Sequence, residues 1–135
     1  MSDVTPSVST LQQMLIDARA RTLALVSDLT GAQLLGPQLV IVNPPLWEIG
    51  HLAWFQERWC LRHVEGEAEL LPSLRADADR LYDSAAVAHA TRWTLPLPSL
   101  DETIKYMQLV LDRVIGRLAS DQGANLAYFA QLAAF

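Results

Sequence analysis

The sequence is poor in cysteine and in lysine. Cys60 is the single cysteine among 135 residues, which excludes an intrachain disulfide and any Cys-x-x-Cys metal or redox site. Because Cys60 lies within an apolar helical segment, we interpret it as a small buried hydrophobic residue rather than a reactive thiol. Lys105 is the single lysine, so arginine supplies the rest of the positive charge.

Positive charge is neither abundant nor clustered. Ten basic residues stand against fifteen acidic ones, which gives a net charge of -5, and no basic run occurs. A surface that binds nucleic acid needs a basic patch that neutralises phosphates. We therefore expect no nucleic-acid partner.

Long apolar runs are missing as well. The richest stretch, Leu46 to Phe55, is interrupted by Glu48 and His51 and falls short of the ~18 residues that a membrane-spanning helix needs. Residues 1–9 have neither the basic region nor the apolar core of a secretory signal. We expect a soluble, cytoplasmic protein that does not associate with membranes.

What the sequence does contain is enough apolar residues for one core. A chain of 135 residues has the usual size of a single domain, and its 51% of hydrophobic residues excludes disorder as the main description. Periodicity predicts no strand and four helical segments. These run from about Thr10 to Leu29, Pro44 to Val64, Ser99 to Leu118, and Gly123 to Phe135. The sequence predicts an all-α fold with one domain over residues 1–135.

Two predicted helices begin with capping-box spacing, Ser9 with Gln12 and Ser99 with Glu102. Each has an apolar face with steps of three and four residues. The face of the first helix consists of Leu11, Met14, Leu15, Ala18, Leu25 and Leu29. The face of the helix after Ser99 consists of Leu100, Ile104, Met107, Leu111, Val114 and Leu118.

A long connector separates the second and third predicted helices. It covers Glu67 to Pro98, with a short helix expected around Ser73 to Tyr82. A connection of this length in a four-helix bundle usually joins two parallel helices by a crossover. No Gly, Asn or Pro terminates the last helix, so we expect a shortened fourth helix and a domain that is incomplete at its C-terminus.

The second predicted helix holds three of the four tryptophans. Trp47, His51 and Trp54 recur at helical spacing, which places an imidazole on an aromatic face. Gly50 costs up to ~1 kcal/mol in a helix interior, so we expect another group to approach the backbone there. Two interpretations of His51 stay open, a core histidine satisfied by a carbonyl or carboxylate, and a metal ligand.

The remaining polar residues offer no complete metal site. His63 lies twelve residues after His51, ~18 Å along a helix, so both cannot bind one metal, and we expect His63 to cap the helix end. His89 lies in the connector, where it is either solvated or able to reach the bundle. Glu57 and Arg58 are interpreted as an ordinary ion-pair layer. Catalytic metal sites typically use three protein ligands, and one secure histidine is too few.

A family resemblance rests on these residues. The run from Pro44 to Glu57 resembles the start of the second helix in the DinB-like domains of non-haem iron sulfoxide synthases, the enzymes of ergothioneine and selenoneine biosynthesis. The pattern Trp-x-x-Gly-His-x-x-Trp-Phe is fairly specific to that group. The resemblance extends to residues 82–93 and 128–135 and is closest to the selenoneine-synthase-like branch. It implies a DinB-like four-helix bundle with a long crossover between helices two and three.

The resemblance also implies a metal site and a substrate contact. His51 aligns with the first ligand of a three-histidine Fe²⁺ site. The other two ligands belong to a His-Glu-x-x-His motif that would begin directly after Phe135, and this sequence ends before it. Arg92 matches connector arginines that bind a carboxylate of the thiol substrate, and the alternative is a pair with Asp83 or another surface acid.

Three hypotheses for function follow from the resemblance. In the first, the chain is the N-terminal iron-binding part of an oxidoreductase that uses oxygen to join a thiol or selenol to a histidine betaine. His51 is then a metal ligand and Arg92 a substrate contact, no catalytic residue is assigned, and the chain alone is expected to bind Fe²⁺ weakly and to be inactive. The second is a stand-alone, non-catalytic helical module that forms a homodimer. The third is a DinB-superfamily thiol transferase, which would still need the missing histidines.

Overall fold

Every regular element that the structure describes is helical. The computed structural model describes residues 6–121 and 124–135. The α-helices are α1 (Val8–Val26), α2 (Pro45–Glu57), α3 (Ala78–Tyr82), α4 (Leu100–Ser120) and α5 (Ala124–Ala134). Two 3-10 helices, η1 (Gly31–Leu34) and η3 (His89–Trp93), lie in the connectors, and a π-helix, η2 (Arg58–Arg62), extends α2. The predicted all-α fold is confirmed.

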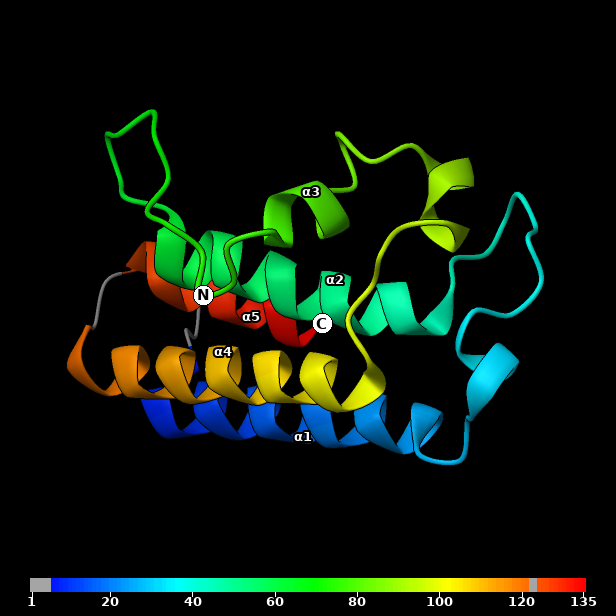
Figure 1. The fold of residues 1–135 in the computed structure, drawn as a ribbon. Coiled ribbons are helices and arrows are strands. Elements are labelled where there is room, and N and C mark those ends of the chain that lie inside the picture. Colours follow the sequence, from blue (N-terminus) through cyan, green and yellow to red (C-terminus); the bar gives the residue numbers. More distant parts are fainter. Residues whose placement is uncertain (1–5, 122–123) are drawn as a thin grey trace.

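The four longer helices, α1, α2, α4 and α5, form a bundle in which two helices run one way and two run the other way (Figure 1). α2 and α4 run the same way, whereas α1 and α5 run the opposite way. α2 packs mainly on α4, and α1 packs mainly on α5. The connector between α2 and α4 is therefore a crossover between parallel helices, as its length predicts.

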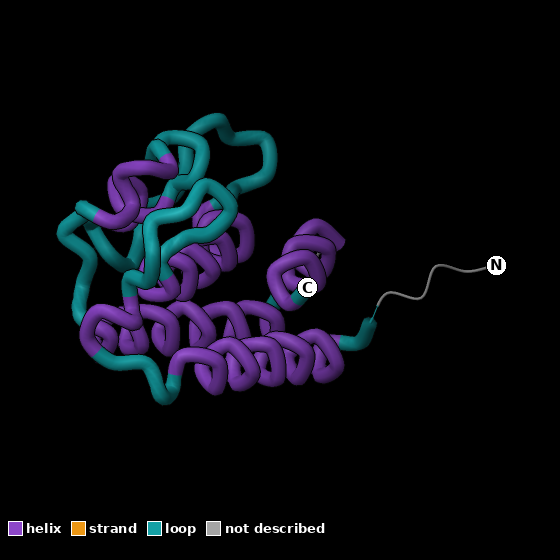
Figure 2. The backbone as a smooth tube through the Cα atoms, turned by 90° about the vertical axis from the view of Figure 1, so that its right-hand side faces the viewer, coloured by secondary structure: helices purple, strands orange, loops and turns teal. Residues whose placement is uncertain are grey.

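The connectors gather with α3 on one side of this bundle. Figure 2 shows α3 and the long loops over the side where α2 lies, away from α1. α3 packs directly on α2. The residues that the sequence places in the connector are thus brought over the aromatic face of α2.

The start of α1 differs from the prediction. The helix begins at Val8, and the hydroxyl of Ser7, not of Ser9, accepts a hydrogen bond from the Thr10 amide at 3.2 Å. A cap needs only a hydroxyl and the amide three residues further on, and Ser7 has both. The predicted apolar face is also wrong at Leu25, which is exposed. Adjacent helical residues point about 100° apart, and Val26 is the one that faces the core.

α2 is shorter than predicted as an α-helix and continues as a π-helix. The α-helical part ends at Glu57, and the wider turns of η2 carry the chain to Arg62. Amphipathic spacing alone does not distinguish the two helix types over a few residues. At the other end, Pro45 occupies the first turn, where backbone N–H groups have no partner within the helix and the missing N–H of proline costs nothing.

α4 agrees best with its prediction. Ser99 caps it by accepting a hydrogen bond from the Glu102 amide at 3.2 Å, and Met107, Val114 and Leu118 are buried. The predicted start of the last helix near Gly123 lies outside the described residues, and α5 is described from Ala124 over 11 residues. Within the described part of the chain, no helix is both long and apolar enough to cross a membrane.

Candidate functional site

The contact between α2 and α3 depends on Gly50. A β-carbon at this position would lie 2.3 Å from the Tyr82 ring, far inside van der Waals contact. Tyr82 is itself fully buried. The predicted close approach at Gly50 is therefore confirmed, and the approaching group is the aromatic ring at the end of α3.

His51 lies next to this contact and is bonded to α3. Its Nδ1 is 2.8 Å from the carbonyl oxygen of Tyr82. Because a carbonyl oxygen only accepts, Nδ1 carries the proton and donates, and Nε2 is left with its lone pair. The imidazole is stacked between Trp47, with ring centroids 4.7 Å apart, and Trp54, at 5.7 Å. The half-buried ring thus has one bonded nitrogen, Nδ1, and its Nε2 has no hydrogen-bond partner among the described residues.

The two tryptophans beside His51 are also bonded to α3. Trp47 Nε1 donates to the carbonyl oxygen of Leu81 at 2.6 Å, and Trp54 Nε1 donates to the Asp79 carboxylate at 2.7 Å. Arg62 forms two hydrogen bonds with the same carboxylate, at 2.6 and 2.9 Å. These bonds, with that of Arg62 dominant, lower the pKa of Asp79 to about 2.

Arg92 is buried and lies over the Trp47 ring, with Cζ 4.0 Å from the ring centroid. Its Nη1 donates to Asn43 Oδ1 at 2.8 Å, and its Nη2 donates to the Val87 carbonyl at 2.9 Å. No acidic partner of Arg92 occurs among the described residues, so the alternative pair with Asp83 is not formed. Nε is buried and has no hydrogen-bond partner in that part of the chain.

The ion-pair layer expected of Glu57 and Arg58 is not formed. Glu57 is fully buried, and its carboxylate accepts hydrogen bonds from Tyr106 Oη at 2.8 Å and from Ser73 Oγ at 2.6 Å. The Leu74 amide donates to its second oxygen at 2.6 Å. Arg58 instead lies over the Trp59 ring, with Cζ 3.9 Å from the centroid. The sequence carries no spacing signal for this network, because its members come from three separate segments.

The other two histidines lie apart from this arrangement. His63 is the C-cap residue of η2, as expected of a residue at the helix end, and its ring packs on Trp59 and Phe129. His89 Nε2 is 2.6 Å from the Val42 carbonyl, which uses the nitrogen that His51 leaves open. Among the described residues, no group of three or more His, Cys, Asp or Glu side chains is placed to hold a metal ion.

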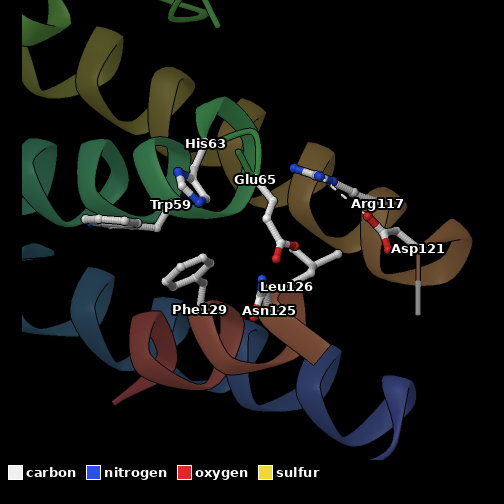
Figure 3. Close-up of a pocket in the computed structure, with 8 residues that line it drawn as sticks. All are labelled: Trp59, His63, Glu65, Arg117, Asp121, Asn125, Leu126 and Phe129. Atoms are coloured by element: carbon white, nitrogen blue, oxygen red, sulfur yellow. Dashed lines mark hydrogen bonds and ion pairs between the residues drawn. The ribbon is translucent and has the colours of Figure 1, made fainter. Parts of the chain in front are cut away.

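A cavity of about 350 Å³ adjoins His63 at the far end of α2. Figure 3 shows Trp59, His63 and Phe129 on one side of it and Glu65, Arg117 and Asp121 on the other. Arg117 donates to the Cys60 carbonyl oxygen and pairs with Asp121. The cavity therefore has both charge signs and does not include His51 or Arg92.

Cys60 is fully buried near this end, as predicted for a small hydrophobic residue. Burial raises the pKa of its thiol to about 12, which keeps the thiolate population negligible at neutral pH.

Comparison with known proteins gives a consistent match. The family model described as the DinB superfamily matches residues 14–132. Hercynine oxygenase of Mycolicibacterium thermoresistibile is 32% identical over 113 residues, 84% of this chain and 25% of the relative. The hercynine oxygenase of Mycobacterium tuberculosis is 34% identical over 104 residues, 76% of this chain and 24% of the relative. The chain thus spans about a quarter of the length of the curated relatives it matches.

Proposed function

This chain belongs to the DinB superfamily, and we propose that it is the iron-binding DinB-like domain of an oxidoreductase that joins a thiol or selenol to a histidine betaine with oxygen. The similarity to hercynine oxygenases over most of the chain supports an oxygenase that acts on hercynine or a related betaine. The Trp-x-x-Gly-His-x-x-Trp-Phe pattern around His51 supports the iron site.

The observation that carries this proposal is the hydrogen bond from His51 Nδ1 to the Tyr82 carbonyl. Histidines that bind metals through Nε2 commonly donate Nδ1–H to a backbone carbonyl or carboxylate, which fixes the tautomer and the ring orientation. His51 has this arrangement. It fits one ligand of an iron site, and the two further histidines implied by the resemblance do not occur in these 135 residues.

Bound iron would supply the activation of oxygen in this proposal. The chain's own residues hold the ligand and shield it. Trp47 and Trp54 both stack on the imidazole, which restricts the access of water to the ring. Neither tryptophan ring is free to turn away, because each indole N–H is bonded to α3.

Arg92 is proposed as the residue that binds a carboxylate of the thiol or selenol. Its buried Nε has no hydrogen-bond partner within the described residues, which leaves one donor for a carboxylate oxygen. The guanidinium also contacts Trp47, whose ring stacks on His51. A substrate held at Arg92 would therefore lie close to the proposed ligand.

The substrate contact is tested by replacing Arg92 in an active protein that contains this domain and is as long as the relatives. Arg92→Lys keeps the charge and removes the planar donor set, so we expect KM for the thiol to rise while the iron content stays the same. Arg80→Lys is the matched control, the same substitution at an exposed side chain in the connector that carries Arg92. Equal loss of iron and of thiol affinity in Arg92→Lys would contradict a role limited to substrate binding.

Anaerobic titration with Fe²⁺ tests the metal ligand. One imidazole leaves most of the coordination sphere to water, so the 135-residue chain is expected to bind weakly. His51→Ala should abolish that binding, and His63→Ala should leave it unchanged. Tight stoichiometric binding that survives His51→Ala would overturn the assignment. In the gene, a reading frame that continues past codon 135 into a His-Glu-x-x-His motif would further support the enzyme.

A second candidate function, a non-catalytic module that forms a homodimer, is favoured by a different observation. A groove of about 570 Å³ between α1, α2 and α5 is lined largely by apolar side chains, among them the exposed Leu25, Leu52 and Phe135. Burial of these side chains against another copy would be favourable. Light scattering separates the candidates, because a stable dimer that binds no iron supports the module.

A further inference from the structure

The α2 residues that surround the proposed ligand share one structural feature. Trp47, His51 and Trp54 follow one another at steps of four and three residues, and each has a ring N–H that donates to α3. The acceptors are, in order, the Leu81 carbonyl at 2.6 Å, the Tyr82 carbonyl at 2.8 Å and the Asp79 carboxylate at 2.7 Å. The five-residue helix α3 thus supplies hydrogen-bond acceptors for the ring N–H groups of three successive rings on one face of α2.

Gly50 allows α3 to lie at this distance. The Tyr82 side chain occupies the space in which any β-carbon at position 50 would lie, with two ring carbons and the hydroxyl oxygen within 2.6 Å of that point. The same residue supplies the carbonyl that accepts from His51. The position of this carbonyl therefore depends on the absence of a side chain at residue 50.

We infer that α3 is a clamp for His51, in which Tyr82 and Gly50 are positioning residues that hold the imidazole with Nδ1 protonated and Nε2 free. This inference rests on the proposed function, in which His51 binds the metal through Nε2. Neither positioning residue is a ligand. Their effect passes through one hydrogen bond, from the His51 ring to the Tyr82 main chain.

The clamp is anchored away from the ring stack. Arg62 in η2 bonds both oxygens of Asp79 and also donates from Nε to the Leu71 carbonyl at 2.8 Å. These bonds connect the start of α3 to the helix that carries His51. Planar two-point bonds between arginine and a carboxylate restrict orientation as well as distance. Arg62 thus holds α3 at Asp79 and holds the loop before α3 at Leu71, eight residues earlier in the chain.

A comparison of histidines shows that this tautomer is local to the clamp. His89 has a carbonyl 2.6 Å from Nε2, so its proton lies on Nε2 and its open nitrogen is Nδ1. Two histidines of one chain are thus held in opposite tautomers by two different carbonyls. The acceptor, and not the residue type, determines which nitrogen is available.

The test is the tautomer of His51, measured without metal by long-range proton–nitrogen correlation of the imidazole rings at pH 8. The wild-type chain should show His51 almost entirely in the Nδ1–H form and His89 in the Nε2–H form. The peaks of His51 are identified by their loss in His51→Ala. In Gly50→Ala the displaced Tyr82 carbonyl should release the ring, and the His51 signals should move toward the mixed pattern of free imidazole.

Gly116→Ala is the matched control, because a β-carbon at this position in α4 meets nothing within 4 Å. It should leave all three histidine patterns unchanged. Tyr82→Phe should also keep the Nδ1–H form, because the acceptor is the main-chain carbonyl. A folded Gly50→Ala chain whose His51 stays in the Nδ1–H form would overturn the clamp.

If Gly50→Ala does not fold, Asp79→Ala provides the second test. Asp79 is half-exposed, and within the described residues its side chain bonds neither Tyr82 nor His51. Its replacement removes the hydrogen bonds that Arg62 and Trp54 donate to the carboxylate. The His51 tautomer should then become mixed, and an unchanged tautomer would contradict the clamp. The tautomer is measured without iron, so this test is independent of the proposed function. If the tautomers behave as expected but Fe²⁺ does not bind His51, the clamp stands and the metal site is contradicted.

Discussion

The helix formed by α2 and η2 carries the same spacing twice. Trp47 and His51 are four residues apart near its start, and Trp59 and His63 are four residues apart at its end. The first pair is stacked nearly parallel, at 8° and 4.7 Å, whereas the second is tilted by 48° at 5.5 Å. Equal spacing therefore produces two different ring arrangements.

The neighbouring segment accounts for this difference. At the first pair, α3 presents two main-chain carbonyls that bond Trp47 and His51. At the second pair, α5 presents the ring of Phe129, which packs edge-on against His63. A histidine becomes a candidate ligand when a neighbour satisfies one nitrogen and leaves the other open, so the packing partner matters more than the helical spacing.

Loss of a tryptophan ring should lower the free energy of unfolding more at Trp54, beside the first pair, than at Trp59 in the second pair. Trp54 is 6% exposed and bonds Asp79, so Trp54→Ala should lower the free energy of unfolding by about 3 to 5 kcal/mol. Trp59→Ala, at a half-buried ring, should cost clearly less. Urea unfolding followed by circular dichroism measures both. A loss at Trp59 equal to that at Trp54 would mean that the two ends are packed alike.

A smaller effect is expected from a single methyl group at Gly50. Overpacking against the buried Tyr82 ring should make Gly50→Ala less stable by about 2 kcal/mol. Gly116→Ala, in open space, should instead be neutral or more stable by up to about 1 kcal/mol, because alanine is the better helix former. The same urea titration compares them. Equal effects of Gly50→Ala and Gly116→Ala on the free energy of unfolding would contradict the close contact between Gly50 and Tyr82.

The smallest expected effect is a pH dependence at the anchor of α3. The pKa of Asp79 is about 2 in the folded chain against an ordinary value of 3.8, mainly because Arg62 bonds its carboxylate. A lowered folded pKa stabilises the fold above the unfolded pKa, and this stabilisation is lost as the pH falls from about 4 to about 2. Because Asp79 is half-exposed, we expect less than about 1 kcal/mol.

Asp79→Asn isolates this contribution, since it removes the charge and keeps an oxygen for Trp54. The difference in unfolding free energy between the wild-type chain and Asp79→Asn should be largest at pH 6 and should shrink steadily as the pH falls from about 4 through about 2. A difference that stays constant over this range would show that the carboxylate charge does not stabilise α3.

Much of the fold follows from local patterns in the sequence. The apolar steps of α4 and its cap at Ser99 depend on neighbours in sequence, and both are found as predicted. The crossover follows from connector length alone. Gly50 is a local anomaly whose cost indicated a close approach, although the pattern did not identify Tyr82 as the approaching residue.

The site was less predictable, because its contacts join distant segments. The buried carboxylate of Glu57 accepts hydrogen bonds from Ser73 and Tyr106, which are 16 and 49 residues away in the chain. The sequence alone indicates the adjacent Arg58 as its partner, because no local pattern points to the distant residues. The acidic partner that the sequence offers Arg92 as an alternative is not found among the described residues, and the guanidinium bonds Asn43 and the Val87 carbonyl. Partners of this kind depend on how the connector folds back on α2, which periodicity does not describe.

The most direct test of the proposed ligand is paramagnetic broadening of the three histidine rings during an anaerobic Fe²⁺ titration of this chain. Unpaired electrons broaden the signals of nuclei close to the ion, so even weak binding identifies the ring that is involved. We predict that the His51 signals broaden first, at substoichiometric iron, while those of His63 stay sharp. Broadening of His63 or His89 before His51 would contradict the claim that the carbonyl of Tyr82 prepares His51 as the metal ligand.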